Sequence, residues 1–179
     1  MNNEILLDKE RIIKELIALD RRVSKRFLSR KRKFQIVIVG GAAFLLKHNL
    51  NRTTNDIDSL KLEYELKKYI SENSDLFHIN DNCYNIMLKH PDYEDRLVEM
   101  NINYDFKMLK IYVMSDYDLI IAKFGRGHRE DINDILKSGI LDGIERDKLD
   151  KLMNTAIDFC PTNPEDIRSR WENFKKKYF

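Results

Sequence analysis

Hydrophobic and polar positions change their period several times along the chain, and each change marks a predicted element. Apolar residues recur at helical spacing from residue 3 to 28, with charged residues between them, which predicts an amphipathic N-terminal helix. The β-branched run Ile36–Val39 predicts a buried strand that stops at Gly40-Gly41. A short apolar helix at 42–47 should follow, and a second strand should open at Asp56. The first third of the chain therefore predicts the order helix, strand, glycine turn, helix, strand.

Later stretches continue this mixture of helices and strands. The alternation at Leu109–Met114 predicts a strand, and Ser115-Asp116 is a good cap for the helix after it. We expect that helix to break at Gly125 and Gly127. Weaker patterns predict short strands at 77–79 and 84–87, and 92–101 leads into a further strand candidate. Helices are predicted to close near 71–73 and to cover 129–136, 147–159 and 166–178.

Asp56 and Asp58 suggest chemistry, because strand side chains alternate between faces. Both carboxylates should point to one side and Ile57 to the other. Like charges roughly 6–7 Å apart repel one another unless cations neutralise them, and a pair of Mg²⁺ or Mn²⁺ ions would do so. The turn at Gly40-Gly41 offers backbone N–H groups at a helix start, where phosphate binds. The pattern predicts a nucleoside triphosphate (NTP) held between the glycines and metal-bound aspartates.

These residues resemble the signature of the polymerase-beta-like nucleotidyltransferase superfamily, in which a Gly-Gly or Gly-Ser turn precedes an Asp-x-Asp strand. The run from Arg52 to Asp58 looks most like the small bacterial branch of AbiE-type toxin nucleotidyltransferases and uncharacterised relatives. A second stretch adds to the resemblance with Asp118-Leu119, Lys123 and then Arg129-x-Asp131-x-x-Asp134. The resemblance covers roughly residues 34–142.

The resemblance implies an α/β (α+β) fold, namely the minimal nucleotidyltransferase arrangement of a mixed sheet flanked by helices. We expect a nucleotidyltransferase-like domain at 34–142. An N-terminal helix with a basic end should precede it at 1–33, and a helical part at 143–179 should pack on it. The implied activity is metal-dependent transfer of a nucleoside monophosphate from an NTP to a hydroxyl of RNA or protein. Such a protein would belong to a toxin or defence system and have a cognate antitoxin as its partner.

Roles for individual residues follow from the same resemblance. Superfamily enzymes often place a third carboxylate on a strand beside the Asp-x-Asp strand, and Glu99 is the best positional candidate, with Asp95 behind it. The lysine of the second stretch, Lys123, is expected to face the triphosphate. The predicted catalytic residues are Asp56, Asp58, Glu99 and Lys123, with Asp56 and Asp58 as metal ligands. The predicted nucleotide-binding residues are Gly40, Gly41, Arg52, Lys123, Arg129 and Asp131.

Structural alternatives stand beside these roles. The structural alternative for Lys123 is that it extends to solvent or pairs with Asp131, and a strand carboxylate such as Glu99 faces solvent by default. An alternative for the whole domain is a catalytically degenerate member of the superfamily, which binds nucleotide or a partner protein without transferring nucleotides. A third alternative is an RNA-binding module that uses residues 21–33, where eight of thirteen residues are cationic. No aromatic stacking platform alternates with those charges, which favours a solvated face instead.

Composition says more about the cellular compartment than about the function. The 179 residues carry a net charge of only +2, so the overall balance selects no partner. Cys83 and Cys160 give neither a disulfide framework nor a metal-ligand spacing, which is typical of a reducing cytosol. With no secretory segment or long apolar run, we expect a cytoplasmic protein without a membrane partner. We expect His78 and His90 to be ordinary surface or loop histidines without a metal role.

Overall fold

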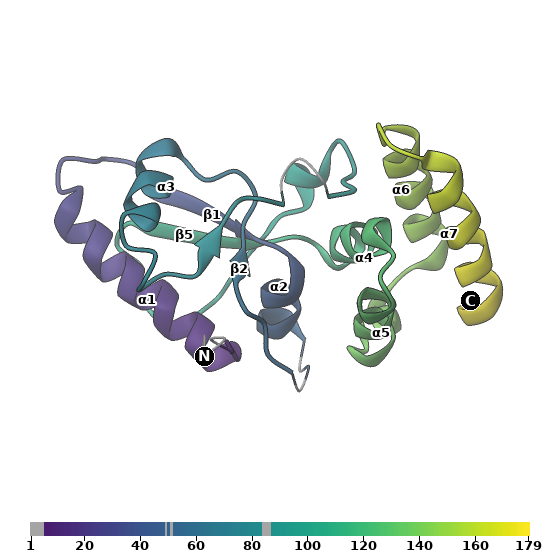
Figure 1. Ribbon diagram of the computed structural model, residues 1–179, viewed down its shortest axis with the longest axis horizontal. Coiled ribbons are helices and arrows are strands. Elements are labelled where there is room, and N and C mark those ends of the chain that lie inside the picture. Colours follow the sequence, from purple (N-terminus) through teal and green to yellow (C-terminus); the bar gives the residue numbers. More distant parts are fainter. Residues whose placement is uncertain (1–5, 49, 51, 84–86) are drawn as a thin grey trace. The chain divides into compact units, whose positions relative to one another are not determined.

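The structure is a computed structural model that describes residues 6–48, 50, 52–83 and 87–179 (Figure 1). It divides into two compact units, of which the first comprises residues 1–85 and 97–113 and the second residues 86–96 and 114–179. The division runs through the expected 34–142 domain, because the helices after residue 114 group with the C-terminal helices. Helices combined with a small mixed sheet confirm the predicted α/β class.

Unit 1 contains the sheet. Strands β1 (Phe34–Ile38) and β5 (Leu109–Val113) are parallel, and β4 (Val98–Glu99) pairs antiparallel with β5, which gives the order β1-β5-β4. Strands β2 (Ile57–Asp58) and β3 (Ile79–Asn80) form a separate parallel pair. An isolated bridge between Ile38 and Ser59 connects the end of β1 to the residue after β2. The sheet therefore brings β2 to the β1 edge and β4 to the opposite edge.

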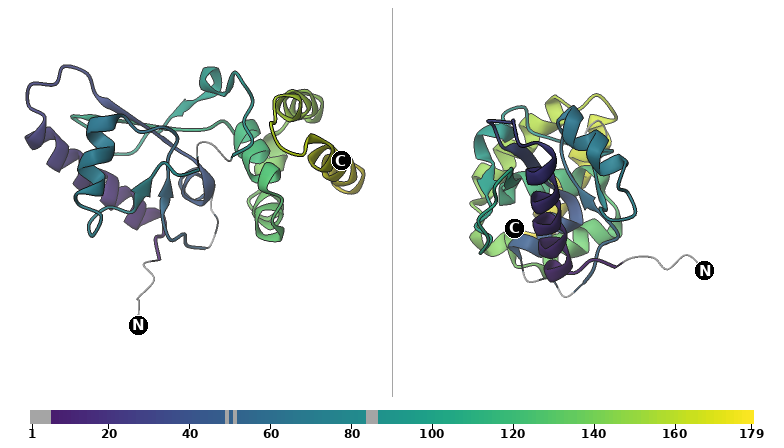
Figure 2. Two further views of the ribbon diagram at one scale, coloured as in Figure 1. Left: turned by 45° about the horizontal axis from the view of Figure 1, so that its top comes forward. Right: turned by 90° about the vertical axis from the view of Figure 1, so that its left-hand side faces the viewer.

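Three helices pack in unit 1, namely α1 (Lys9–Arg26), α2 (Gly40–Lys47) and α3 (Tyr64–Ser71). The right-hand view of Figure 2 looks onto α1, which runs across this unit. Asp8 caps α1 by accepting from the Arg11 backbone N–H at 2.8 Å. The apolar stripe of α1 is buried as its spacing predicts, at Ile12, Leu16, Leu19 and Val23. The strand expected at 84–87 falls largely outside the described residues.

Asp20 attaches α1 to the sheet. Its side chain is fully buried and accepts backbone N–H groups from Lys107 at 3.0 Å, Met108 at 2.8 Å and Leu109 at 2.9 Å. A buried carboxylate is stable only when its oxygens are hydrogen-bonded, and here three amides provide those bonds. The start of β5 is thereby fixed against the helix.

Unit 2 is helical, with α4 (Asp116–Arg126), α5 (Arg129–Lys137), α6 (Arg146–Asp158) and α7 (Pro164–Tyr178). Two 3₁₀ turns, η1 (Tyr93–Arg96) and η2 (Ile140–Gly143), accompany them. Phe124, Trp171 and Phe174 form its aromatic core, with ring centroids 5.3–5.6 Å apart. The expected break at Gly125 is wrong, because α4 continues through it and ends at Gly127, whose φ of +67° suits glycine. A Cβ at Gly125 would meet the Leu88 side chain, so its glycine serves close packing.

Candidate functional site

The end of β1 turns directly into α2 at Gly40. Val39 is extended and donates its backbone N–H to the Asp58 carbonyl at 2.9 Å, which ties the turn to β2. Gly40 has a φ of +61°, a left-handed conformation that L side chains rarely adopt. The first amides of α2 therefore begin at a glycine, next to the strand that carries Asp58.

The carboxylate of Asp58 occupies the space that a side chain at Gly40 would need. A Cβ built on Gly40 would lie 2.8 Å from Asp58 Oδ2, which is closer than van der Waals contact allows. The missing side chain thus lets a carboxylate lie against the turn. The sequence predicted that glycines and acids converge here, and Asp58 does lie at the turn.

Gly41 has a similar relation to a cation. A Cβ at Gly41 would lie 2.6 Å from Arg52 Nη2 and 3.1 Å from Thr54 Oγ1. The Arg52 guanidinium and the Thr54 hydroxyl therefore lie against the second glycine of the turn. The structure brings together four of the predicted residues: Gly40, Gly41, Arg52 and Asp58.

Asp56 is held from the neighbouring strand by Asn80. The Asn80 Nδ2 group donates to Asp56 Oδ2 at 3.1 Å, and Asn80 Oδ1 accepts the Asn82 backbone N–H at 3.1 Å. The second bond sets which end of the amide faces Asp56. Ile57 is fully buried between the two half-buried aspartates, as strand alternation predicts.

Asn80 is the residue that sequence reasoning missed. It lies directly opposite Asp58 in the β2–β3 pairing. The stretch around it is weakly patterned and its strand is two residues long, so only the pairing of distant segments reveals its position. The next residue, Asp81, is turned to other partners, namely Lys67 Nζ at 2.6 Å and the Leu62 backbone N–H at 3.3 Å.

Glu99, the proposed third carboxylate, lies on β4. The strand order places β5 and β1 between β4 and the bridge to Ser59, so Glu99 is not on the strand beside β2. Its carboxylate is exposed and pairs with Lys110 Nζ at 3.0 Å. The strand beside β2 carries the amide of Asn80 instead of an acid.

The residues at the turn fit a magnesium ion. Mg²⁺ prefers oxygen ligands and is usually bound by one or two carboxylates together with water and substrate phosphates. Asp56 and Asp58 supply two carboxylates, and Asp58 lies against Gly40, the first residue of α2. Across the described ranges, no three His, Cys, Asp or Glu side chains gather as a protein-only metal site.

The second predicted cluster lies within unit 2. Lys123 is buried, and its ammonium donates to Asp131 Oδ1 at 2.7 Å and to Asp134 Oδ2 at 2.6 Å. Arg126 adds a bond to Asp131 Oδ1 at 2.7 Å, while Arg129 is exposed at the start of α5. These are the contacts of the structural alternative, in which Lys123 joins α4 to α5.

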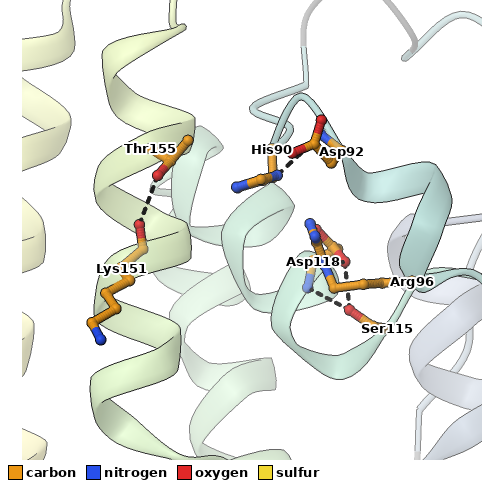
Figure 3. Close-up of polar contacts among 7 residues, drawn as sticks. All are labelled: His90, Asp92, Arg96, Ser115, Asp118, Lys151 and Thr155. Carbon is orange, nitrogen blue, oxygen red and sulfur yellow. Dashed lines mark hydrogen bonds and ion pairs between the residues drawn. The ribbon is translucent and has the colours of Figure 1, made fainter.

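Another buried network in unit 2 surrounds Asp118 (Figure 3). Arg96 binds this carboxylate with two parallel bonds, Nε to Oδ2 at 2.9 Å and Nη2 to Oδ1 at 2.7 Å. Nearby His90 is buried, contrary to the surface position expected from the sequence, and its Nδ1 accepts the Asp92 backbone N–H at 3.0 Å. Burial, assisted by the Arg96 charge, lowers the pKa of His90 below its ordinary value of 6.5. His78 is half-buried, with Nδ1 2.9 Å from Glu15 Oε2.

A mixed α/β fold with a glycine turn against an Asp-x-Asp strand defines a protein of the nucleotidyltransferase class. The family model described as "Nucleotidyltransferase of unknown function (DUF6036)" matches residues 14–179, and the chain belongs to this family. The finer placement near the AbiE-type branch stays a prediction. No curated protein and no solved structure matches the chain. Within the described residues, no helix combines the length and apolarity that crossing a membrane requires.

Proposed function

We propose that the chain transfers a nucleoside monophosphate from an NTP to a hydroxyl group, in a Mg²⁺-dependent reaction at Gly40, Asp56 and Asp58. The observation that carries this proposal is the contact between the Asp58 carboxylate and the side-chain-free turn at Gly40. It brings a carboxylate oxygen, the kind of ligand that Mg²⁺ prefers, beside the glycine at which a helix starts. Those two features suit the two ends of a metal-bound triphosphate.

The turn and Arg52 would bind the phosphates. The start of α2 carries the partial positive charge of the helix dipole, and Val39 has no polar side chain with which to cap it. Arg52 lies against Gly41, so its guanidinium is at the same turn. A phosphate here would meet both backbone N–H groups and a cation.

Asp56 and Asp58 would hold the metal ion, with Asn80 positioning Asp56 through its amide. When bound, Mg²⁺ supplies positive charge that stabilises the developing charge on the phosphate oxygens. The acceptor hydroxyl oxygen forms a bond to the α-phosphorus, the bond from that phosphorus to the bridging oxygen breaks, and pyrophosphate leaves. The hydroxyl proton passes to water. RNA or protein as the acceptor, and a toxin role with an antitoxin partner, belong to the proposal through the resemblance alone.

A second candidate is nucleotide binding without transfer, and Asn80 favours it. Where superfamily members often have a third carboxylate, an amide can neither take up the hydroxyl proton nor add negative charge for a second metal ion. Glu99 is separated from β2 by two strands. The catalytic role of Glu99 and the nucleotide roles of Lys123, Arg129 and Asp131 stay predictions.

Isothermal titration with each NTP, in Mg²⁺ and then in EDTA, tests the binding step. Asp56→Asn and Asp58→Asn should abolish metal-dependent binding, whereas Asp75→Asn, at an exposed position outside the turn, should leave it unchanged. Wild-type protein that binds no NTP with Mg²⁺ would end both candidates. Incubation with α-labelled NTPs and total RNA or cell protein then separates them, because only a transferase labels a macromolecule.

A further inference from the structure

A hollow at the β4–β5 edge of unit 1 is not used by the nucleotide site. It has a volume of about 480 Å³. Its lining includes Asn101, two lysines, two acids and two aromatic rings. The charged and aromatic residues are Lys33, Lys110, Glu99, Asp105, Tyr104 and Phe106. Since β2 bridges to β1 and the hollow adjoins β4, the two lie at opposite edges of the sheet.

The aromatic pair is held by the local backbone. Tyr104 and Phe106 meet edge to face, with ring centroids 4.8 Å apart. Two backbone hydrogen bonds between residues two positions apart hold the loop. The Tyr104 N–H donates to the Ile102 carbonyl at 2.6 Å, and the Phe106 N–H donates to the Tyr104 carbonyl at 3.2 Å. Both residues remain partly exposed. Partly exposed rings that are fixed in place are suited to stacking on nucleobases.

The basic segment at 21–33 adjoins these rings. Arg21 Cζ lies 5.7 Å from the Tyr104 ring centroid, and Lys33 Nζ donates to the Phe106 carbonyl at 2.5 Å. Lys25 lies one helical turn after Arg21, on the same face of α1. The segment's own aromatic residue, Phe27, instead packs on Phe34 and Tyr69. The stacking platform that the basic segment lacks in sequence is thus supplied by residues 104–106.

Charge around the hollow is positive after its acids are counted. Glu99 pairs with Lys110, and Asp105 pairs with Lys107. Asp20 beneath the loop is fully buried and binds backbone amides. Four cations lie with these three carboxylates, namely Arg21 against the Tyr104 ring, Lys33 and Lys110 in the lining, and Lys107 paired with Asp105. The excess suits a polyanion, and the rings distinguish one with unpaired bases from an acidic peptide or a duplex.

We propose that this hollow binds a single-stranded polynucleotide, with bases on Tyr104 and Phe106 and phosphates on Arg21, Lys33 and Lys110. We take this polynucleotide to be the RNA acceptor of the transfer reaction, and that assignment rests on the proposed function. Binding itself requires neither NTP nor Mg²⁺.

Fluorescence anisotropy with a fluorescein-labelled oligouridylate of about 12 nucleotides tests the site on the full chain in EDTA. We expect binding that weakens steeply as salt is raised. Tyr104→Ala should weaken it about fivefold or more, whereas Tyr104→Phe, which keeps the ring, should retain it. Lys33→Gln should weaken binding and reduce the logarithmic salt slope by about 1, and Lys137→Gln, at an exposed position in unit 2, should not. Circular dichroism checks that each variant is folded.

Three outcomes would overturn the proposal. They are no binding at low salt, equal affinity in wild type and folded Tyr104→Ala, and equal competition by a duplex or by polyglutamate. An oligothymidylate of the same length distinguishes RNA from DNA, and a preference for DNA would remove the acceptor assignment. The titration of NTP with Tyr104→Ala keeps the two proposals separable, because loss of oligonucleotide binding should leave Mg²⁺-dependent NTP binding intact.

Discussion

Replacing Gly40 with alanine tests the geometry on which the proposed function depends. The added methyl group would lie 2.8 Å from Asp58 Oδ2, so the carboxylate must retreat by roughly half an ångström or more to reach van der Waals distance. The φ of +61° adds strain for any L side chain, about 1–2 kcal/mol. Overpacking of this kind adds about 1–3 kcal/mol. We expect Gly40→Ala to lower the free energy of unfolding by about 2–5 kcal/mol.

Two other glycines separate these contributions. Gly139 has a φ of +71°, but a Cβ there would make only an ordinary van der Waals contact, with Asp142 Oδ2 at 3.4 Å, so Gly139→Ala reports mainly the backbone strain. Gly143 has no atom within 4 Å of a built Cβ and no positive φ, so Gly143→Ala should be nearly neutral. Urea unfolding should rank the variants in the order Gly143→Ala, Gly139→Ala, Gly40→Ala, from least to most destabilised.

The functional effect of Gly40→Ala should exceed its effect on stability. A displaced Asp58 carboxylate would hold the metal ion poorly, so the affinity for Mg²⁺–NTP should fall at least about tenfold in protein that is still folded. Titration calorimetry measures that affinity, with Gly139→Ala as the matched control that should bind normally. Wild-type affinity in folded Gly40→Ala would refute the idea that Asp58 and the turn form one site.

Three further predictions concern other polar side chains. Asn80→Asp should lower the thermal midpoint without metal, since a third carboxylate joins Asp56 and Asp58. Mg²⁺ should raise the midpoint of this variant more than that of the wild type, and equal shifts would contradict a metal site at these residues. Asp20→Ala leaves three amides without their acceptor and should lower the free energy of unfolding in urea by about 3–5 kcal/mol. Asp20→Asn should be milder because one acceptor oxygen remains, and wild-type stability of the alanine variant would show that Asp20 does not hold β5 against α1. The pKa of His90 is lowered in the folded protein, so the unfolded chain binds its proton first and stability should fall as the pH drops below 6.5. His90→Asn should weaken this pH dependence of stability, and an unchanged profile would exclude His90 as its source.

Local patterns predicted the elements around the turn because their cause is local. A β-branched run makes β1, and an apolar run after Gly40 makes α2. The alternation of Asp56, Ile57 and Asp58 predicted which side chain is buried. The same reasoning misplaced His90, since its burial depends on packing within unit 2 and no periodic pattern marks it.

Pairings between distant segments were beyond local reasoning. Lys123 could be predicted to lie at the polar edge of a helix, but its burial between two aspartates depends on how α5 packs against α4. The aromatic rings beside the basic segment come from about seventy residues further along the chain. In both cases the packing of one element on another determines the environment of the charge, although the Lys123–Asp131 ion pair itself was among the alternatives that the sequence offered.

The strand beside β2 shows how such a pairing bears on function. The third acid was sought at Glu99 because its segment reads as a strand, yet a strand's neighbour depends on hydrogen bonding to a distant partner, and β3 takes the place beside β2. The residue found there, Asn80, donates the hydrogen bond that orients Asp56, which a carboxylate could not do, and it lacks the charge and basicity of a carboxylate. An amide at this position is compatible with holding a metal-bound nucleotide, and it leaves activation of the acceptor to another group or to the acceptor itself. Labelling of a macromolecule by the wild-type protein would therefore show that this family member transfers nucleotides with two carboxylates and an amide.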